Sequence, residues 1–276
     1  MLDLTQINDN WYQVKKISET VWCISDHGFD LMYLVKGKER AMLIDTGFGV
    51  GNLPDLCSKF ASVEILSVLT HAHPDHCMGA GQFSNTYVAK EDVQLLQYLS
   101  DSNNRKAMAD NFLDGNTEFT CDPATINNWA NCKVNQITEI EDGHVFDLGE
   151  RKIRVILTPG HTKGSLCLLD ESEGRLFSGD TVLSCNHLLN LPESTDLQTF
   201  YQSLLYLQTF ESGFNVIHPG HEKAPLGKEK LTELIHGVED ILSGKIKGIV
   251  DETTDGSPMK YSFGEHNWVM GRSVAK

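Results

Sequence analysis

The sequence predicts an α/β protein in which short strands and amphipathic helices alternate along the chain. Short runs rich in Val, Ile and Leu end at turns that contain Gly or Asp, which is typical of strands. Two later segments, residues 197–210 and 228–242, repeat apolar residues at helical spacing. No linker divides the chain, so we expect one domain over residues 1–276.

The expected elements follow from these patterns in chain order. Strands are predicted at residues 20–25, 31–36, 40–44, 63–70, 134–140, 144–146, 152–157, 165–169, 175–178 and 215–218. Helices are predicted near residues 54–60, 91–99, 104–112, 197–210 and 228–242, with Ser194 or Thr195 as the N-cap of the fourth.

Two regions are expected to be additions to this framework. The helices after residue 88 and the polar stretch that follows them, whose periodicity is poor, indicate a helical insertion at about 88–131. The segment at about 251–276 contains MKYSF and NWVMG, which predict a hairpin at a sheet edge, as a C-terminal extension.

Charge and composition exclude several classes of partner. The chain has 38 acidic and 23 basic residues and a formal net charge of −15, which opposes binding to nucleic acid or to an anionic membrane surface. No apolar run approaches the roughly 18 residues of a membrane span, so no membrane partner is predicted. The N-terminal residues lack the apolar core of a secretory signal, and the seven cysteines form no CxxC pair. We therefore expect a cytoplasmic location.

The most informative segment is Leu69–His76, LTHAHPDH, at the end of an apolar strand. It places three histidines and one aspartate within a single turn. His71 and His73 are two residues apart on extended backbone and share one face, so they could hold one metal ion. Asp75 and His76, on the following turn, point to a second ion, and all four are residue types that bind zinc.

Three later segments also place such residues directly after predicted strands. They are TPGHT around His161, SGDT around Asp180, and HPGH with His218 and His221. Taken singly, His161 is more typical of a turn or core histidine, and Asp180 is compatible with a plain turn. Together, successive strand ends on one sheet edge form the natural crevice for a site.

At this point the sequence resembles the metallo-β-lactamase superfamily, and in particular its glyoxalase II-like hydrolases. The resemblance covers residues from about 20 to 223 and rests on LIDTG, THAHPDHCMG, TPGHTKGS, SGDT and PGH in the family's order. It implies a four-layer αβ/βα sandwich, the metallo-β-lactamase fold, with a two-metal site at one edge.

The resemblance also implies a role for each matching residue. His71, His73 and His161 would bind the first ion; Asp75, His76 and His221 would bind the second; Asp180 would bridge the two. Asp45 would order a ligand histidine or its turn without meeting metal, although a plain turn aspartate is an equal alternative. The family pattern selects His221 as ligand and leaves His218 as a supporting or core residue.

The implied chemistry is hydrolysis by a dinuclear metal site. Two ions roughly 3.5–4 Å apart can share a bridging hydroxide that attacks an ester, thioester or lactone of a small-molecule substrate. Asp75 could orient the nucleophile and pass its proton to the leaving group. Two zinc ions per chain are expected, with iron or manganese as alternatives. Cys77 and Cys185 occupy no ligand position and are interpreted as small apolar core residues.

Other reactions of the superfamily remain as alternatives. A small phosphodiester is the second substrate class, and β-lactam hydrolysis is disfavoured because that class usually lacks an aspartate like Asp180. A persulfide dioxygenase with one iron has compatible ligands. The loop after Asp180 is expected to line the pocket, with Asn186 and His187 as candidate substrate contacts or plain loop residues. The sequence is silent on oligomeric state and on the physiological substrate.

Overall fold

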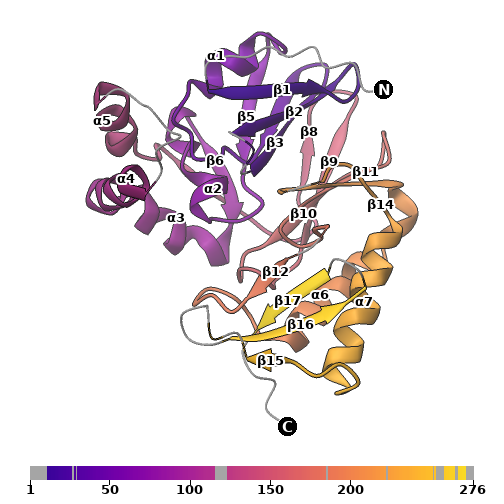
Figure 1. The fold of residues 1–276 in the computed structure, drawn as a ribbon. Coiled ribbons are helices and arrows are strands. Elements are labelled where there is room, and N and C mark those ends of the chain that lie inside the picture. The colour runs from indigo at the N-terminus through magenta and orange to yellow at the C-terminus, as the bar shows by residue number, and fades with distance from the viewer. Residues whose placement is uncertain are drawn as a thin grey trace. The chain divides into compact units, whose positions relative to one another are not determined.

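The computed structural model describes residues 11–26, 28, 30–115, 123–184, 186–221, 223–250, 252, 258–264 and 267–271. The chain forms two compact units. The first comprises Met1–Ile140 with Leu148–Glu150, and the second comprises Glu141–Asp147 with Arg151–Lys276. Each unit contains β-sheet and helices, which confirms the predicted α/β class (Figure 1). Within the described residues, no helix combines the length and the apolar character that a membrane crossing needs.

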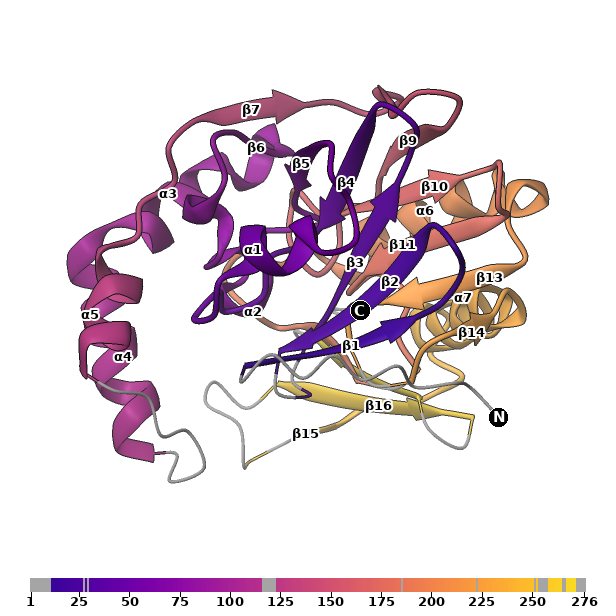
Figure 2. The ribbon, with the colours of Figure 1, turned by 90° about the horizontal axis from the view of Figure 1, so that it is seen from above.

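The first unit is built on a seven-stranded mixed sheet. Its strands follow chain order: β1 (Tyr12–Lys16), β2 (Val21–Asp26), β3 (Asp30–Lys36), β4 (Arg40–Ile44), β5 (Glu64–Val68), β6 (Thr86–Ala89) and β7 (Ile137–Ile140). Strands β1 to β4 pair antiparallel, and β4 to β7 pair parallel. Figure 2 shows β1 to β4 lying side by side. Because β4 and β5 are parallel neighbours, the residues that follow Ile44 and Val68 emerge at the same sheet edge.

Helices of the first unit are α1 (Leu53–Ser58), α2 (Pro74–Cys77), α3 (Val93–Ser100), α4 (Ser102–Gly115) and α5 (Pro123–Asn131), with 3₁₀ turns at Ala80–Gln82 and Lys90–Asp92. Helix α1 begins at Asn52, whose side chain accepts a hydrogen bond from the Asp55 amide at 3.1 Å. The predicted strands and helices of this unit are therefore present, with bounds that differ by a few residues.

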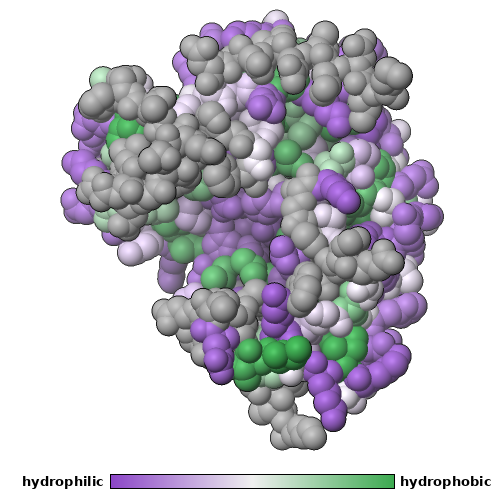
Figure 3. Space-filling view, in the orientation of Figure 1, coloured by the Kyte–Doolittle hydropathy of each residue, from purple (hydrophilic) through white to green (hydrophobic). Residues whose placement is uncertain are grey.

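The second unit contains two sheets. The six-stranded sheet has the order β14 (Leu226–Gly227), β13 (Val216–Pro219), β11 (Arg175–Gly179), β10 (Leu166–Asp170), β9 (Lys152–Leu157) and β8 (Val145–Asp147). The four-stranded sheet has the order β12 (His187–Leu189), β17 (Asn267–Gly271), β16 (Met259–Phe263) and β15 (Ile249–Val250). Its edge strand β15 exposes Ile249 and Val250, and an apolar patch lies there in Figure 3.

Helices α6 (Leu197–Gln208) and α7 (Glu229–Leu242) pack on the core of the second unit, with a 3₁₀ turn at Glu211–Gly213. On α7 the buried residues include Leu231, Leu234, Ile235 and Val238, the spacing of one helix face. These residues share one cluster with residues of β10, β11 and β13, so the helix pair forms one side of the core.

Three expectations about elements were wrong. Helix α5 forms where an irregular polar stretch was expected, because Trp129 and Ala130 are buried in one cluster with Leu96 and Leu69, and Ile126 packs against that cluster. The predicted insertion also begins inside β6, a strand of the main sheet. The predicted hairpin exists as β16 and β17, but it is central, because β12 pairs with β17 and β15 with β16.

Several elements had no counterpart among the predictions. They are β1, β6, β12, β14 and β15, of which β12, β14 and β15 are only two or three residues long. Strands of this length contain too few residues for an alternating pattern to be recognised. The predicted role of Cys185 and parts of the predicted extension at 251–276 lie outside the described residues.

The N-cap of α6 is Asp196 and not Ser194 or Thr195. Its carboxylate accepts a hydrogen bond from the Thr199 amide at 2.8 Å. The Ser194 hydroxyl instead donates to the backbone oxygen of His161 at 2.8 Å, and the Thr195 amide donates to the oxygen of Gly160 at 2.9 Å. The two residues proposed as caps therefore tie the start of α6 to the turn that carries His161.

We expect Asp196→Ala to lower the free energy of unfolding by about 1 kcal/mol, because the helix loses its capping carboxylate and the Thr199 amide loses its acceptor. Urea unfolding followed by circular dichroism measures this loss. Gln202→Ala, at an exposed position of the same helix, is the control and should change stability by less than about 0.5 kcal/mol. Equal losses in both variants would contradict the assignment of the cap.

Candidate metal centre

The first group of candidate ligands follows strand β5. Ligand atoms of His71 and His73 lie within 4.8 Å of each other, as do those of His71 and His76 and those of Asp75 and His76. His73 has extended backbone, with ψ of 155°, and α2 then begins with Pro74. The turn of α2 brings His76 back beside His71, whose ring centroid lies 4.0 Å from that of His76. The four predicted ligands of this segment are therefore adjacent in the first unit.

A buried carboxylate, Asp45, orients two of these histidines. It accepts hydrogen bonds from the Thr70 amide at 2.7 Å, from the Thr70 hydroxyl at 2.8 Å and from Nδ1 of His76 at 2.9 Å. Since a carboxylate only accepts, Nδ1 of His76 carries a proton. The Thr70 hydroxyl donates to Asp45, so it accepts from Nδ1 of His71 at 3.1 Å. Both rings are therefore the tautomer whose Nε2 has a free electron pair for a metal.

Asp45 occupies its position because β4 and β5 are adjacent and parallel. It follows β4 directly and has a left-handed backbone, with φ of 61°, which aspartate tolerates better than most residues. The next residue, Thr46, donates from both its amide and its hydroxyl to the His76 oxygen, at 2.7 and 3.0 Å. The turn after β4 thus holds both the ring and the backbone of His76.

Other buried polar residues hold the same segment, and sequence reasoning missed them. Asp92 is 2% exposed and accepts from the Ala72 amide at 2.9 Å, which fixes the backbone between His71 and His73. Arg105, on α4, donates to the oxygens of Met78 and Trp129 at 3.0 and 2.9 Å. Both residues lie inside predicted helices, where a charged side chain is ordinarily exposed to solvent, so neither gave a usable signal.

The second group of candidate ligands lies in the second unit. His161 Nε2 and His221 Nε2 lie 3.4 and 3.3 Å from the same oxygen, Oδ2 of Asp180. His161 Nδ1 is 2.8 Å from the backbone oxygen of Leu188, so it carries the proton and leaves Nε2 as the ligand atom. His161 and Asp180 are buried, whereas His221 is partly exposed.

Sheet topology explains how this second group forms. Strand β10 pairs antiparallel with both β9 and β11, and β11 pairs parallel with β13, so β9, β11 and β13 all run in the same direction. Their carboxyl ends, followed by His161, Asp180 and His221, reach the same edge of the sheet. A register shift between Phe177 and Gly179 and a bond from the Gly220 amide to the Gly179 oxygen, 2.9 Å, align Asp180 with His221.

The remaining predicted residues have other surroundings. His218 is fully buried, stacks on Phe177 and places Nε2 3.1 Å from the Arg175 guanidinium, so it packs in the core of the sheet. His187 is 2% exposed, and its Nε2 accepts from the Leu183 amide at 3.2 Å. A substrate contact through this ring would require the turn to open. Asn186 is exposed, and its role in substrate contact stays a prediction.

Burial raises the pKa of two titratable groups near the candidate ligands. It raises the pKa of the Cys77 thiol far above the usual range, so this fully buried cysteine stays protonated, as expected for a small core residue. Burial also raises the pKa of Asp26 to about 6, against hydrogen bonds from Trp11 and the Phe48 amide that lower it. The hydrogen bond from the Phe48 amide to the Asp26 carboxylate holds the turn that follows Asp45.

Comparison with known proteins identifies the family. Residues 26–221 match the metallo-beta-lactamase superfamily, and the chain belongs to this superfamily. It is 29% identical over 208 residues to the human protein named acyl-coenzyme A thioesterase MBLAC2, covering 67% of this chain and 71% of that one. It is 25% identical over 201 residues to the probable polyketide biosynthesis zinc-dependent hydrolase BaeB of Bacillus velezensis, covering 72% of this chain and 75% of that one.

The fold is also that of solved metallo-β-lactamases. The structure of DIM-1 metallo-beta-lactamase superposes with a TM-score of 0.60 at 16% identity, over 84% of this chain and 98% of that one. The likeness confirms the predicted metallo-β-lactamase fold. The predicted class of enzyme, a metal-dependent hydrolase of ester-type bonds, agrees with the two named relatives.

Replacing Asp45 by Asn should weaken zinc binding by roughly 10–100-fold, because an amide cannot accept from both the Thr70 hydroxyl and the His76 ring at the position of Oδ2. Asn adopts the left-handed backbone as readily as Asp, so the change acts through the hydrogen bonds. Competition with a chromophoric chelator measures the affinity. Asp55→Asn, at an exposed position on α1, is the control; an Asp45→Asn affinity equal to that of the control would contradict this role.

Proposed function

We propose that this protein is a two-zinc hydrolase of small-molecule thioesters, acting in the cytoplasm. The observation that carries the proposal is the orientation of the candidate histidines: hydrogen bonds to Nδ1 of His71, His76 and His161 leave Nε2 of each ring as the metal-binding atom. Rings held in this way by a carboxylate, a hydroxyl and a carbonyl are typical of metal ligands.

The donor set fits zinc. Five neutral imidazoles and two carboxylates are ligands that zinc prefers, and the thiols of Cys77 and Cys167 are buried and engaged elsewhere. Following the family's motif order, we assign His71, His73 and His161 to one ion, Asp75, His76 and His221 to the other, and Asp180 to both. Bound zinc lowers the pKa of water and polarises a carbonyl oxygen.

The chain's own residues supply the proton transfer. The Asp75 side chain is 29% exposed, and its Oδ2 lies 3.9 Å from Nε2 of His76, so the carboxylate borders the ligand group and still reaches solvent. The water oxygen bonds to the acyl carbon, the carbon–sulfur bond breaks, and Asp75 passes the proton from the water to the leaving sulfur. The products are a carboxylic acid and a thiol.

Thioesters are favoured over other ester-type substrates because of the relatives. The human relative is named an acyl-CoA thioesterase, and it aligns over 67% of this chain. The bacterial relative is named a zinc-dependent hydrolase of polyketide biosynthesis. The formal net charge of −15 disfavours polynucleotide substrates independently of these names.

The proposal predicts close to two zinc ions per chain and turnover of a thioester that is abolished by a chelator and restored by zinc. Elemental analysis of the purified protein should precede assays on acetyl-CoA, a lactone, a phosphodiester, a β-lactam and a persulfide. Turnover confined to the phosphodiester or the β-lactam would contradict the thioester assignment. One iron per chain with persulfide oxidation would contradict the hydrolase itself.

Asp180→Ala should lose about one metal ion per chain and at least a hundredfold of kcat/KM, because its Oδ2 is the atom that both His161 and His221 approach. Glu239→Ala removes an exposed carboxylate from α7 of the same unit and is the control. Metal content and kcat/KM are measured on the same preparations. Wild-type metal content and turnover in Asp180→Ala would show that this carboxylate binds neither ion.

A further inference from the structure

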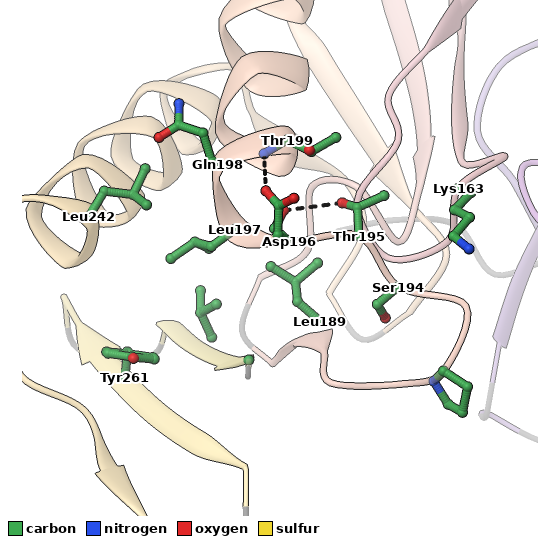
Figure 4. Close-up of a pocket in the computed structure, with 13 residues that line it drawn as sticks. Lys163, Leu189, Ser194, Thr195, Asp196, Leu197, Gln198, Thr199, Leu242 and Tyr261 are labelled. Carbon is green, nitrogen blue, oxygen red and sulfur yellow. Dashed lines mark hydrogen bonds between the residues drawn. The ribbon is translucent and has the colours of Figure 1, made fainter. Parts of the chain in front are cut away.

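The second unit contains a cavity that the proposed chemistry does not use. Its volume is about 630 Å³, within the range of pockets that bind small molecules. It lies among β12, the start of α6, the end of α7 and the β16–β17 hairpin, as Figure 4 shows. The apolar lining residues include Leu189, Leu197, Leu242, Tyr261 and Val269.

One wall of this cavity is bonded to the segment that carries His161. Leu189 and Ser194 line the cavity. The oxygen of Leu188, the neighbour of Leu189, accepts from the His161 ring at 2.8 Å, and the Ser194 hydroxyl donates to the His161 backbone oxygen at 2.8 Å. The cavity therefore begins next to a residue that we assign to the metal, within the same unit.

The lining combines buried apolar residues with exposed polar ones. Leu189, Leu197, Tyr261 and Val269 are buried and belong to the hydrophobic core cluster, whereas Lys163 and Gln198 are exposed. Figure 4 shows Leu197 and Tyr261 on the side away from Lys163, with Leu189 between them and Lys163. A ligand that fits this lining has an apolar tail and a polar end.

The space opens to the surface at exposed residues such as Lys163 and Gln198, so a ligand can enter it from solvent. Gly271, at the end of β17, gives a second observation. A Cβ atom built on it would meet no atom within 4 Å, and its φ is outside the left-handed region. The space beside Gly271 is therefore open to a side chain or to a ligand.

We propose that this cavity is an acyl pocket, which takes the apolar tail of the thioester substrate and sets the preferred chain length. The inference rests on the proposed function and extends it to a substrate class, thioesters of medium or long acyl chains. Apolar burial supplies the selectivity: each methylene that enters the pocket contributes roughly a fourfold gain in kcat/KM.

The test compares kcat/KM for acetyl-, butyryl-, octanoyl- and lauroyl-CoA. We expect the wild-type protein to favour the longer chains until the pocket is full. Gly271→Leu places a side chain in the open space and should lower the octanoyl-to-acetyl ratio of kcat/KM by at least about tenfold, since it excludes two or more methylenes. An unchanged ratio overturns the proposal.

Two further variants keep the result interpretable. Gly271→Ala fills less of the space, so it should lower only the lauroyl-to-acetyl ratio, and it serves if the leucine variant does not fold. Ser262→Leu adds the same side chain at an exposed position of β16, on the opposite face from the pocket residue Tyr261. Its ratios should equal those of the wild type; a drop like that of Gly271→Leu contradicts the pocket.

Calorimetric titration with lauric acid separates this proposal from the proposed function, because binding needs no turnover. Lauric acid bound by the wild type and not by Gly271→Leu, without hydrolysis of any thioester, would reject the hydrolase and keep the apolar pocket. Thioester hydrolysis that is independent of chain length, without lauric acid binding, would reject the pocket and keep the hydrolase.

Discussion

The structure of the first unit depends on one buried carboxylate. Asp45 accepts three hydrogen bonds, two from Thr70 and one from His76, and through the Thr70 hydroxyl it also determines the tautomer of His71. A buried charge without such partners would be strongly destabilising. The hydrogen bonds that compensate the burial of this carboxylate therefore also orient the rings of His71 and His76. The parallel pairing of β4 with β5 brings Asp45 and these partners together.

In the second unit, a backbone oxygen instead of a carboxylate orients a candidate ligand histidine. The ring of His161 is held by the Leu188 oxygen, and its own backbone oxygen is held by Ser194. The chain between these two residues also forms a wall of the proposed acyl pocket and leads into α6, which Asp196 caps. One segment thus orients a proposed metal ligand and shapes the space in which the substrate tail is expected to lie.

Most of the fold was predictable because its strands are apolar runs that end at turns. The exceptions have physical causes. Helix α5 lies in a stretch of poor periodicity and is stabilised by the burial of Trp129 and Ala130, which depends on the partners that they meet. Strand β12 has three residues and exists because β17, about eighty residues later, pairs with it. Asp92 and Arg105 support the ligand segment from positions that look solvent-exposed in the sequence.

By itself, the sequence determined the chemistry that is available: five histidines and two aspartates placed after strands, in an order that the metallo-β-lactamase superfamily shares. The tertiary structure decided which atoms of those candidate ligands are left available to a metal. Nδ1 of His76 and of His161 donates to Asp45 and to the Leu188 oxygen, both distant in sequence, and Nδ1 of His71 donates to Thr70, whose hydroxyl Asp45 holds. These bonds leave Nε2 of each ring as the candidate ligand atom. Arg175 engages His218, while His221 approaches Asp180. Residue types are local information, whereas tautomer, orientation and cavity shape arise only when separate segments pack together.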